Sequence, residues 1–219
     1  MNEYPLDVVL NGSRGYVQGT QMLARAAEAI APGQPVILRQ AAFHSITDRL
    51  VSLIRAESAD NLPEQTLGRA VFEGTDGQLM TVVFVEGANT APRADIPPGC
   101  VWTRLDAGHD TPLNADFALS GLTASEDFLN ALIQSLKDLH QSLEDDVADV
   151  WFTGLRKAAV PLPDFPEPEG RLEIRAERLM GRDGAFQSIQ RIAFEGTAGT
   201  RLDAAVTFAF KSRTFSHVA

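Results

Sequence analysis

Two stretches of this 219-residue chain share sequence: RLVSLIRAESADNLPEQTLGRAVFEGTDG, from Arg49 to Gly77, and RLEIRAERLMGRDGAFQSIQRIAFEGTAG, from Arg171 to Gly199. The tetrapeptide IRAE begins at residues 54 and 174, and the tetrapeptide FEGT begins at residues 72 and 194. The two offsets, 174 − 54 = 120 and 194 − 72 = 122, agree to within a short insertion. This agreement predicts an internal duplication, which bears on every later fold assignment.

The similarity extends beyond these stretches. Pro5 to Ile30 faces Pro112 to Leu136, and LRQAAF, which begins at Leu38, faces LRKAAV, which begins at Leu155. Each half then reads as a strand, a helix and four further strands. We therefore expect an α+β chain of two tandem repeats, residues 1–108 and 109–219.

Composition narrows the functional classes. The chain has 29 acidic and 19 basic residues and a net charge of −10, which repels phosphate backbones and disfavours a nucleic-acid partner. No apolar run approaches the roughly 20 residues that span a bilayer, and the N-terminus lacks a secretory pattern, so we expect no membrane partner. A single cysteine, Cys100, suits a reducing cytoplasm and a structural role. His109, Asp110 and His140 lack partners at ligand spacing, so we expect no metal and no cofactor.

Two helices stand out in the pattern. The glycine-rich run NGSRGYVQG (Asn11 to Gly19) leads into an alanine-rich helix over Thr20 to Ile30. The second helix opens at Thr123, where Thr123 and Glu126 fit a capping box. Its apolar positions recur at steps of three and four residues: Phe128, Leu129, Leu132, Ile133, Leu136, Leu139 and Leu143.

The rest of the pattern is mostly strands. Asp76-Gly77 and Gly181 to Gly184 are typical of hairpin turns, and the proline-rich run 161–170 is typical of a loop. The predicted strands are 5–10, 35–43, 50–54, 69–73, 78–85, 101–105, 147–152, 172–176, 189–195 and 204–210.

This organisation resembles the hotdog fold, in which an antiparallel sheet wraps a central helix. The resemblance rests on GTQMLARAAEA (Gly19 to Ala29) and on Arg156 to Glu177. Two tandem copies would form a double hotdog. The family implies chemistry on acyl-CoA or acyl-carrier-protein thioesters, at sites where the helix of one hotdog meets the other hotdog. It also leaves open a homodimer of double hotdogs.

The resemblance does not extend to the dehydratase dyad. That family places a histidine nine residues before the glycine that opens the helix and an acid five residues after it. These positions fall on Leu10 and Ala24 in the first copy, and on Asp116 and Asn130 in the second. Thioesterase-like hydrolysis is therefore the favoured activity.

The candidate catalytic residues lie at the two helix starts. Asp127 would be the base that activates water towards a thioester, since an acid from the helix serves this role in some hotdog thioesterases; Glu126 is the other acid there. Tyr16 and Gln18, beside the helix start at Gly19, would polarise the thioester oxygen. Each has an alternative interpretation: Asp127 stabilises the helix dipole, and Tyr16 packs in a loop.

The candidate substrate-binding residues are spread more widely. Gly19 and Gln21 lie at the first helix start, although Gln21 also fits an exposed helix face. His44, at the end of a strand, would lie near the mouth of a pocket. Arg39 and Arg156, at matching repeat positions with Lys157 beside them, would meet a phosphate of CoA or phosphopantetheine, or simply face solvent.

Two other functions stay open. Loss of the dyad in both copies favours a non-catalytic acyl-binding or interaction protein. The third alternative is a degenerate dehydratase-like partner in fatty-acid or polyketide metabolism.

Overall fold

The computed structural model describes residues 3–56, 63–96, 99–105, 113–142, 149–182 and 185–211. The chain divides into two compact units. The first contains Met1–Pro98, Ala124–Glu126 and Ala159–Asp164, and the second contains Gly99–Thr123, Asp127–Ala158 and Phe165–Ala219. The division of the chain into repeats 1–108 and 109–219 stays a prediction. Neither helix in the described residues is long and apolar enough to cross a membrane.

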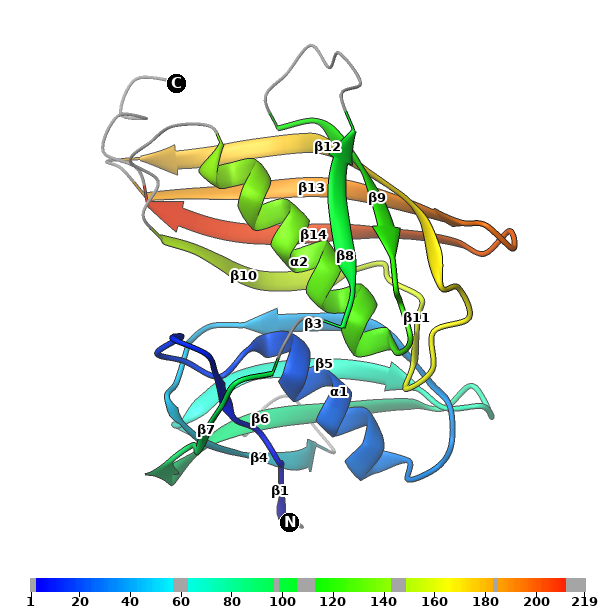
Figure 1. Cartoon of the computed structure of the whole chain (residues 1–219). Coiled ribbons are helices and arrows are strands. Elements are labelled where there is room, and N and C mark those ends of the chain that lie inside the picture. The colour runs from blue at the N-terminus through cyan, green and yellow to red at the C-terminus, as the bar shows by residue number, and fades with distance from the viewer. Residues whose placement is uncertain are drawn as a thin grey trace. The chain divides into compact units, whose positions relative to one another are not determined.

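The first unit is an antiparallel sheet with helix α1 (Gly19–Ile30) drawn across it in Figure 1. Its strand order is β1-β4-β6-β5-β3, and β11 pairs with β3. A short parallel pair, β2 and β7, forms a second sheet. The strands are β1 (Glu3–Pro5), β2 (Leu10–Asn11), β3 (Val36–Phe43), β4 (Arg49–Ala56), β5 (Thr66–Glu73), β6 (Leu79–Thr90), β7 (Arg93–Ala94) and β11 (Val160–Leu162).

Helix α1 is amphipathic, as its sequence predicts. Leu23, Ala26 and Ala27 are buried on one face, whereas Glu28 is exposed. Small alanine side chains allow a helix to pack close to a sheet. The helix ends before Ala31-Pro32-Gly33, where Gly33 has a positive φ of 68° that favours glycine.

The second unit is also an antiparallel sheet with one helix, α2 (Ser125–Gln141). Its strand order is β9-β12-β13-β14-β10, with β8 beyond β9. The strands are β8 (Val101–Leu105), β9 (Ala115–Ser120), β10 (Asp149–Arg156), β12 (Glu169–Arg182), β13 (Ala185–Gly196) and β14 (Arg201–Lys211). Phe128 of α2 packs edge-on against Phe194 of β13, with 5.1 Å between ring centroids.

The described apolar positions predicted for the second helix are all buried: Phe128, Leu129, Leu132, Ile133, Leu136 and Leu139. Leu143 lies outside the described residues. Since almost every turn of α2 contributes a buried side chain, this helix is the core of its unit.

Two local predictions change, and a third is tested only in part. The predicted strand over residues 5–10 is interrupted, because Val8 N–H bonds back to Leu6 C=O at 3.0 Å and turns the chain. The proline-rich loop begins with a strand, β11, in which Pro161 pairs with Ile37 of β3. The second predicted hairpin is only partly visible: β12 and β13 pair as far as Arg182 and Ala185, and residues 183–184 lie outside the described residues.

The turn at Asp76-Gly77 is confirmed. Gly77 has a φ of 78°, and Gly74 N–H bonds to Gln78 C=O at 2.9 Å, closing the hairpin between β5 and β6. The turn between β13 and β14 repeats this pattern, since Gly199 has a φ of 99° and Gly196 N–H bonds to Thr200 C=O at 2.8 Å.

The two sheets nevertheless differ in strand order. Counting the five main strands of each unit in chain order, the first sheet runs 1-3-5-4-2 and the second 1-3-4-5-2. The order of elements along the chain repeats, but the positions of the last two strands are exchanged.

Candidate functional site

The glycine-rich loop before α1 is fixed by the segment around β7. The side-chain amide of Asn11 accepts a hydrogen bond from Ile96 N at 2.9 Å and donates one to Ile96 O at 3.1 Å. The Arg93 guanidinium donates to the carbonyls of Gly12 and Arg14. These hydrogen bonds satisfy polar backbone groups of the loop and hold it in place before the start of α1.

The N-terminus of α1 is uncapped by side chains. Gln18 is the N-cap residue, but its side chain makes no capping hydrogen bond, and the first turn contains no acidic residue. The positive end of the helix dipole and its first amides are therefore not neutralised by any carboxylate of the helix itself. Such a helix start can stabilise negative charge on an oxygen.

Gln21 is buried, contrary to the exposed alternative. Only 4% of it is exposed, and its Oε1 accepts a hydrogen bond from Val9 N at 2.9 Å. The side chain joins the first turn of α1 to the segment between β1 and β2. Helical periodicity alone missed this role because the partner is a backbone group twelve residues earlier.

One backbone hydrogen bond joins the loop that follows β3, which begins at His44, to the loop before α1. Val17 N–H, next to Tyr16 and Gln18, bonds to Thr47 O at 2.8 Å, so the loop after β3 lies beside the loop before α1. His44 is exposed and Tyr16 is half-buried. Tyr16, Gln18, Gly19 and Gln21 are close along the chain at this helix start, whereas His44 N–H bonds to Leu67 O of β5 at 2.8 Å.

The two predicted phosphate-binding arginines differ in their surroundings. Arg39 Nε bonds to Glu73 Oε2 at 2.7 Å, so part of its charge is already balanced. Arg156 is exposed at the end of β10, followed by Lys157 with a φ of 53°. Arg39 belongs to the first unit and Arg156 to the second.

Asp127 caps the start of α2. Its Oδ2 accepts hydrogen bonds from Thr123 N at 3.0 Å and from Thr123 Oγ1 at 2.7 Å. This corrects the predicted capping box, in which Glu126 had that role; Glu126 instead lies 3.9 Å from Arg25 of α1. The backbone of Gly99 packs against Asp127 so closely that a Cβ at residue 99 would lie 2.3 Å from Oδ1.

Cys100 lies against the same turn. Its thiol donates to the Asp127 carbonyl oxygen at 3.2 Å, and burial together with the nearby Asp127 carboxylate raises the pKa of Cys100 to about 11. A thiol with such a pKa is protonated at neutral pH, which agrees with the predicted structural role.

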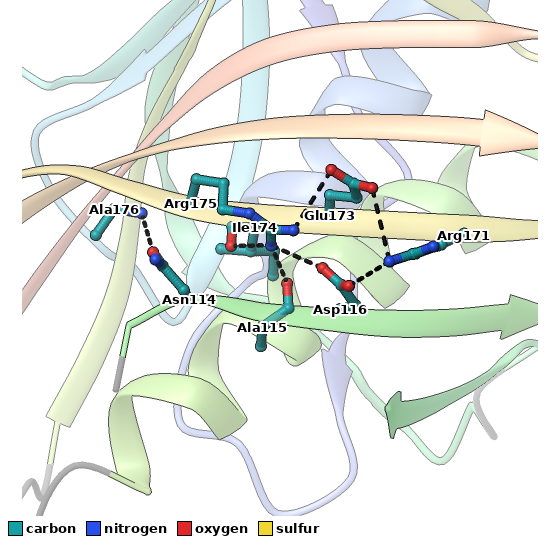
Figure 2. Close-up of polar contacts among 8 residues, drawn as sticks. All are labelled: Asn114, Ala115, Asp116, Arg171, Glu173, Ile174, Arg175 and Ala176. Atoms are coloured by element: carbon teal, nitrogen blue, oxygen red, sulfur yellow. Dashed lines mark hydrogen bonds and ion pairs between the residues drawn. The ribbon is translucent and has the colours of Figure 1, made fainter. Parts of the chain in front are cut away.

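Asp116, at one of the dehydratase dyad positions, is held by two arginines (Figure 2). Its oxygens lie 2.5 Å from Arg171 Nη2 and 2.7 Å from Arg175 Nη1, and its side chain is 1% exposed. Burial alone would raise the pKa of Asp116, but the hydrogen bonds from Arg175 and Arg171 hold it below its usual value. Its oxygens are therefore engaged in joining β9 to β12.

A buried polar cluster in the second unit was not predicted. His140, near the end of α2, is fully buried, as are Ser188 and Gln190 of β13. The His140 ring lies 2.6 Å from Leu136 O through Nδ1, 2.7 Å from Ser188 Oγ and 3.1 Å from Gln190 Nε2, both through Nε2. Because a carbonyl can only accept, Nδ1 carries the proton and Nε2 accepts from Ser188 and Gln190.

This arrangement keeps His140 neutral. Burial lowers its pKa, while the bond to Leu136 opposes that shift. The alternation of side chains in FQSIQRIAF (186–194) could have predicted this cluster. Residues 186, 188, 190, 192 and 194 of this strand all lie on one buried face. Two polar residues on that face require a polar partner, and both contact His140 of α2.

Glu167 is a second buried acid that was missed. It is 1% exposed, and its carboxylate accepts from Ala198 N at 2.9 Å and Thr200 N at 3.0 Å, in the turn between β13 and β14. Hydrogen bonds from Thr200 and Ala198 lower its pKa. It comes from the proline-rich loop, where composition predicted nothing beyond irregular structure.

Comparison with known proteins gives a fold. No family profile and no curated protein matches the chain. A tesB protein from Mycobacterium avium subspecies paratuberculosis is similar in structure, with a TM-score of 0.57, 11% identity and coverage of 93% of this chain and 91% of that one. A putative thioesterase II from Thermobifida fusca gives a TM-score of 0.53 at 13% identity, covering 97% and 93% of the two chains. The dehydratase domain of RzxB from Pseudomonas fluorescens gives a TM-score of 0.50 at 13% identity, covering 95% and 88%. These similarities show the fold alone: the chain has the hotdog fold that its sequence resembles.

Proposed function

We propose that this protein processes acyl thioesters, carried by CoA or by an acyl carrier protein, by thioesterase-like hydrolysis. The observation that carries the proposal is the uncapped start of α1, where Gln18 makes no capping bond and no acid neutralises the helix dipole. The structural similarity to a protein described as a putative thioesterase II supports it. The proposal includes a tandem arrangement of two hotdog repeats.

In the proposed reaction, the first amides of α1 bind the thioester carbonyl oxygen and stabilise the negative charge that develops on it. Tyr16 and the side chain of Gln18 add polar contacts to this oxygen. Gln21, held by Val9, fixes the first turn of the helix. Arg39, Arg156 and exposed His44 contact the polar part of the substrate.

Asp127 is the proposed general base for the attacking water. Its bonds to Thr123 provide a matched pair of variants. Asp127→Asn keeps an oxygen that can accept from Thr123 but cannot take a proton. Thr123→Val removes the hydroxyl donor but keeps the carboxylate.

The test is release of thiol from CoA esters of graded chain length and aromatic type. Hydrolysis by the wild type, lost in Asp127→Asn and retained in Thr123→Val, would support both the activity and the base. Hydrolysis retained in both variants would assign Asp127 to capping alone. Gln18→Leu tests the first helix start separately and should lower kcat, because it removes a proposed contact to the developing oxyanion.

One specific observation favours a binding protein as the second candidate. Asp116 is neutralised by two arginines, and the other dyad positions hold Leu10, Ala24 and Asn130. If no thioester is hydrolysed but acyl-CoA raises the melting temperature, the protein binds acyl groups without turnover.

A further inference from the structure

Strand β8 forms one end of the sheet of the second unit. It pairs with β9 in continuous antiparallel register, from Val101 opposite Ser120 to Leu105 opposite Asp116. Among the described residues, no strand pairs with its other side. Figure 1 shows β8 beside β9 at this end of the sheet. An open edge of this kind is a template on which another strand can add.

The chemistry of this edge favours pairing. Natural edge strands are usually protected by lysine, proline, a bulge or an inward-pointing charge. The sequence VWTRL of β8 contains no lysine or proline, and its register with β9 has no bulge; its one charged residue, Arg104, is on the face towards α2 but is exposed. By contrast β1, which ends the sheet of the first unit, is three residues long and contains Glu3 and Pro5.

Two of the large apolar side chains that the described residues expose lie on this short strand. Val101 is 61% exposed and Leu105 is 38% exposed. With Thr103 between them, they occupy one face of β8, because side chains alternate along a strand. They form a short apolar row beside an open backbone edge.

The opposite face of β8 is fixed to α2. Trp102 Nε1 donates to Asp138 Oδ2 at 2.7 Å, and Arg104 Nη1 lies 3.4 Å from Ser142 Oγ. These contacts hold the strand in an extended form, so little conformational entropy is lost when a partner strand adds.

We propose that β8 is a self-association edge, on which β8 of a second copy pairs antiparallel about Thr103. A two-fold axis at Thr103 places Val101 opposite Leu105 of the second copy, and Leu105 opposite its Val101. The two exposed apolar residues of each copy then cover one another, and Trp102 faces Arg104 of the second copy, where ring and guanidinium attract. The five-residue pattern is self-complementary in this register and in no parallel one.

The association is weak and depends on concentration, because one short strand buries less area than a standard interface. The net charge of −10 on each copy opposes it, so salt strengthens it by screening. Sedimentation of the full chain, from dilute to near-millimolar concentration, should show the mass rise from 23.7 kDa towards twice that value.

The decisive variants change both apolar positions. Val101→Lys with Leu105→Lys sets lysine opposite lysine in the proposed dimer and should abolish association. Val101→Lys with Leu105→Glu sets lysine opposite glutamate twice and should restore it. Leu79→Lys is the control, since Leu79 is 62% exposed but lies on β6, which has a strand on both sides.

Each outcome has a clear meaning. Loss with two lysines, recovery with lysine and glutamate, and no effect at Leu79 support the proposal, once melting curves show that all variants are folded. A wild type that stays monomeric throughout overturns it. So does a dimer that survives two lysines, or a lysine–glutamate variant that fails to associate.

Discussion

Replacing His140 with phenylalanine tests the buried polar cluster of the second unit. Phenylalanine is close in size and keeps the ring contact with Phe208, whose centroid lies 5.4 Å away. It removes the acceptor that Ser188 and Gln190 share. The Leu136 carbonyl loses its hydrogen bond from the His140 ring but stays paired, because a backbone carbonyl at that point of a helix also accepts a bond within the helix.

The expected loss follows from the groups left without partners. The Ser188 hydroxyl can turn towards Gln190 Oε1, 3.5 Å away, which recovers part of one bond. The Gln190 amide is left buried and unpaired. An unsatisfied buried group costs about 1–3 kcal/mol, so His140→Phe should lower the free energy of unfolding by about 2–5 kcal/mol.

The control removes the partners as well. In His140→Phe with Ser188→Ala and Gln190→Met, no polar group is left unpaired, and an apolar cluster of similar shape can be nearly neutral. Urea unfolding followed by tryptophan fluorescence measures each variant. The reasoning is refuted if His140→Phe costs less than about 1 kcal/mol, or if the triple variant costs as much as the three single changes added together.

Three further predictions follow from buried groups. Because burial lowers the pKa of His140 in the folded protein, the unfolded state binds more protons than the folded state as the pH falls below about 6.5. The free energy of unfolding should therefore fall there by at most about 1.4 kcal/mol per pH unit. In His140→Gln the free energy of unfolding should depend less on pH in that window. Glu167→Gln should lower the melting temperature by several degrees, since the turn amides lose a charged acceptor, and Ala198→Asp in that background should restore part of it. Cys100, with a pKa of about 11, should resist iodoacetamide in the folded protein at pH 8 and react in urea, as mass spectrometry can measure.

The sequence predicted the elements better than their contacts. Helical periodicity located both helices, because each has one apolar face against a sheet. The strands came out longer than their apolar runs: the strand expected over 172–176 is β12 (Glu169–Arg182). Backbone pairing continues past the apolar residues, where composition gives no signal.

The site shows why side-chain roles are harder to predict. Glu126 and Asp127 are adjacent acids at a helix start, and only the position of Thr123 decides which one caps it. Gln21 is polar and lies in an alanine-rich helix, yet a backbone amide twelve residues away makes it a buried residue. Such pairings depend on segments that meet only in the folded chain. The backbone bond from Val17 N–H to Thr47 O, which joins two loops far apart in sequence, likewise has no signal in the sequence.

The repeated FEGT turn agrees with an internal duplication, whereas the exchanged strand order does not. In the first turn the Asp76 carboxylate accepts from Gln78 N at 2.9 Å; the matching residues, 76 + 122 = 198 and 78 + 122 = 200, are Ala198 and Thr200. There the aspartate is missing, and Glu167 provides the carboxylate from another loop. A carboxylate contacts the leading glycine of both turns: a Cβ on Gly74 would lie 2.9 Å from Asp76, and one on Gly196 would lie 2.3 Å from Glu167.

The two turns share their glycines and a nearby carboxylate, but Asp76 is an exposed residue of its own turn, whereas Glu167 is a buried residue of another loop. Strand order is set by pairing across the whole sheet, and FEGT does not encode it. Internal duplication therefore stays a prediction: the matching FEGT turns agree with it, whereas the two sheets differ in the order of their last two strands.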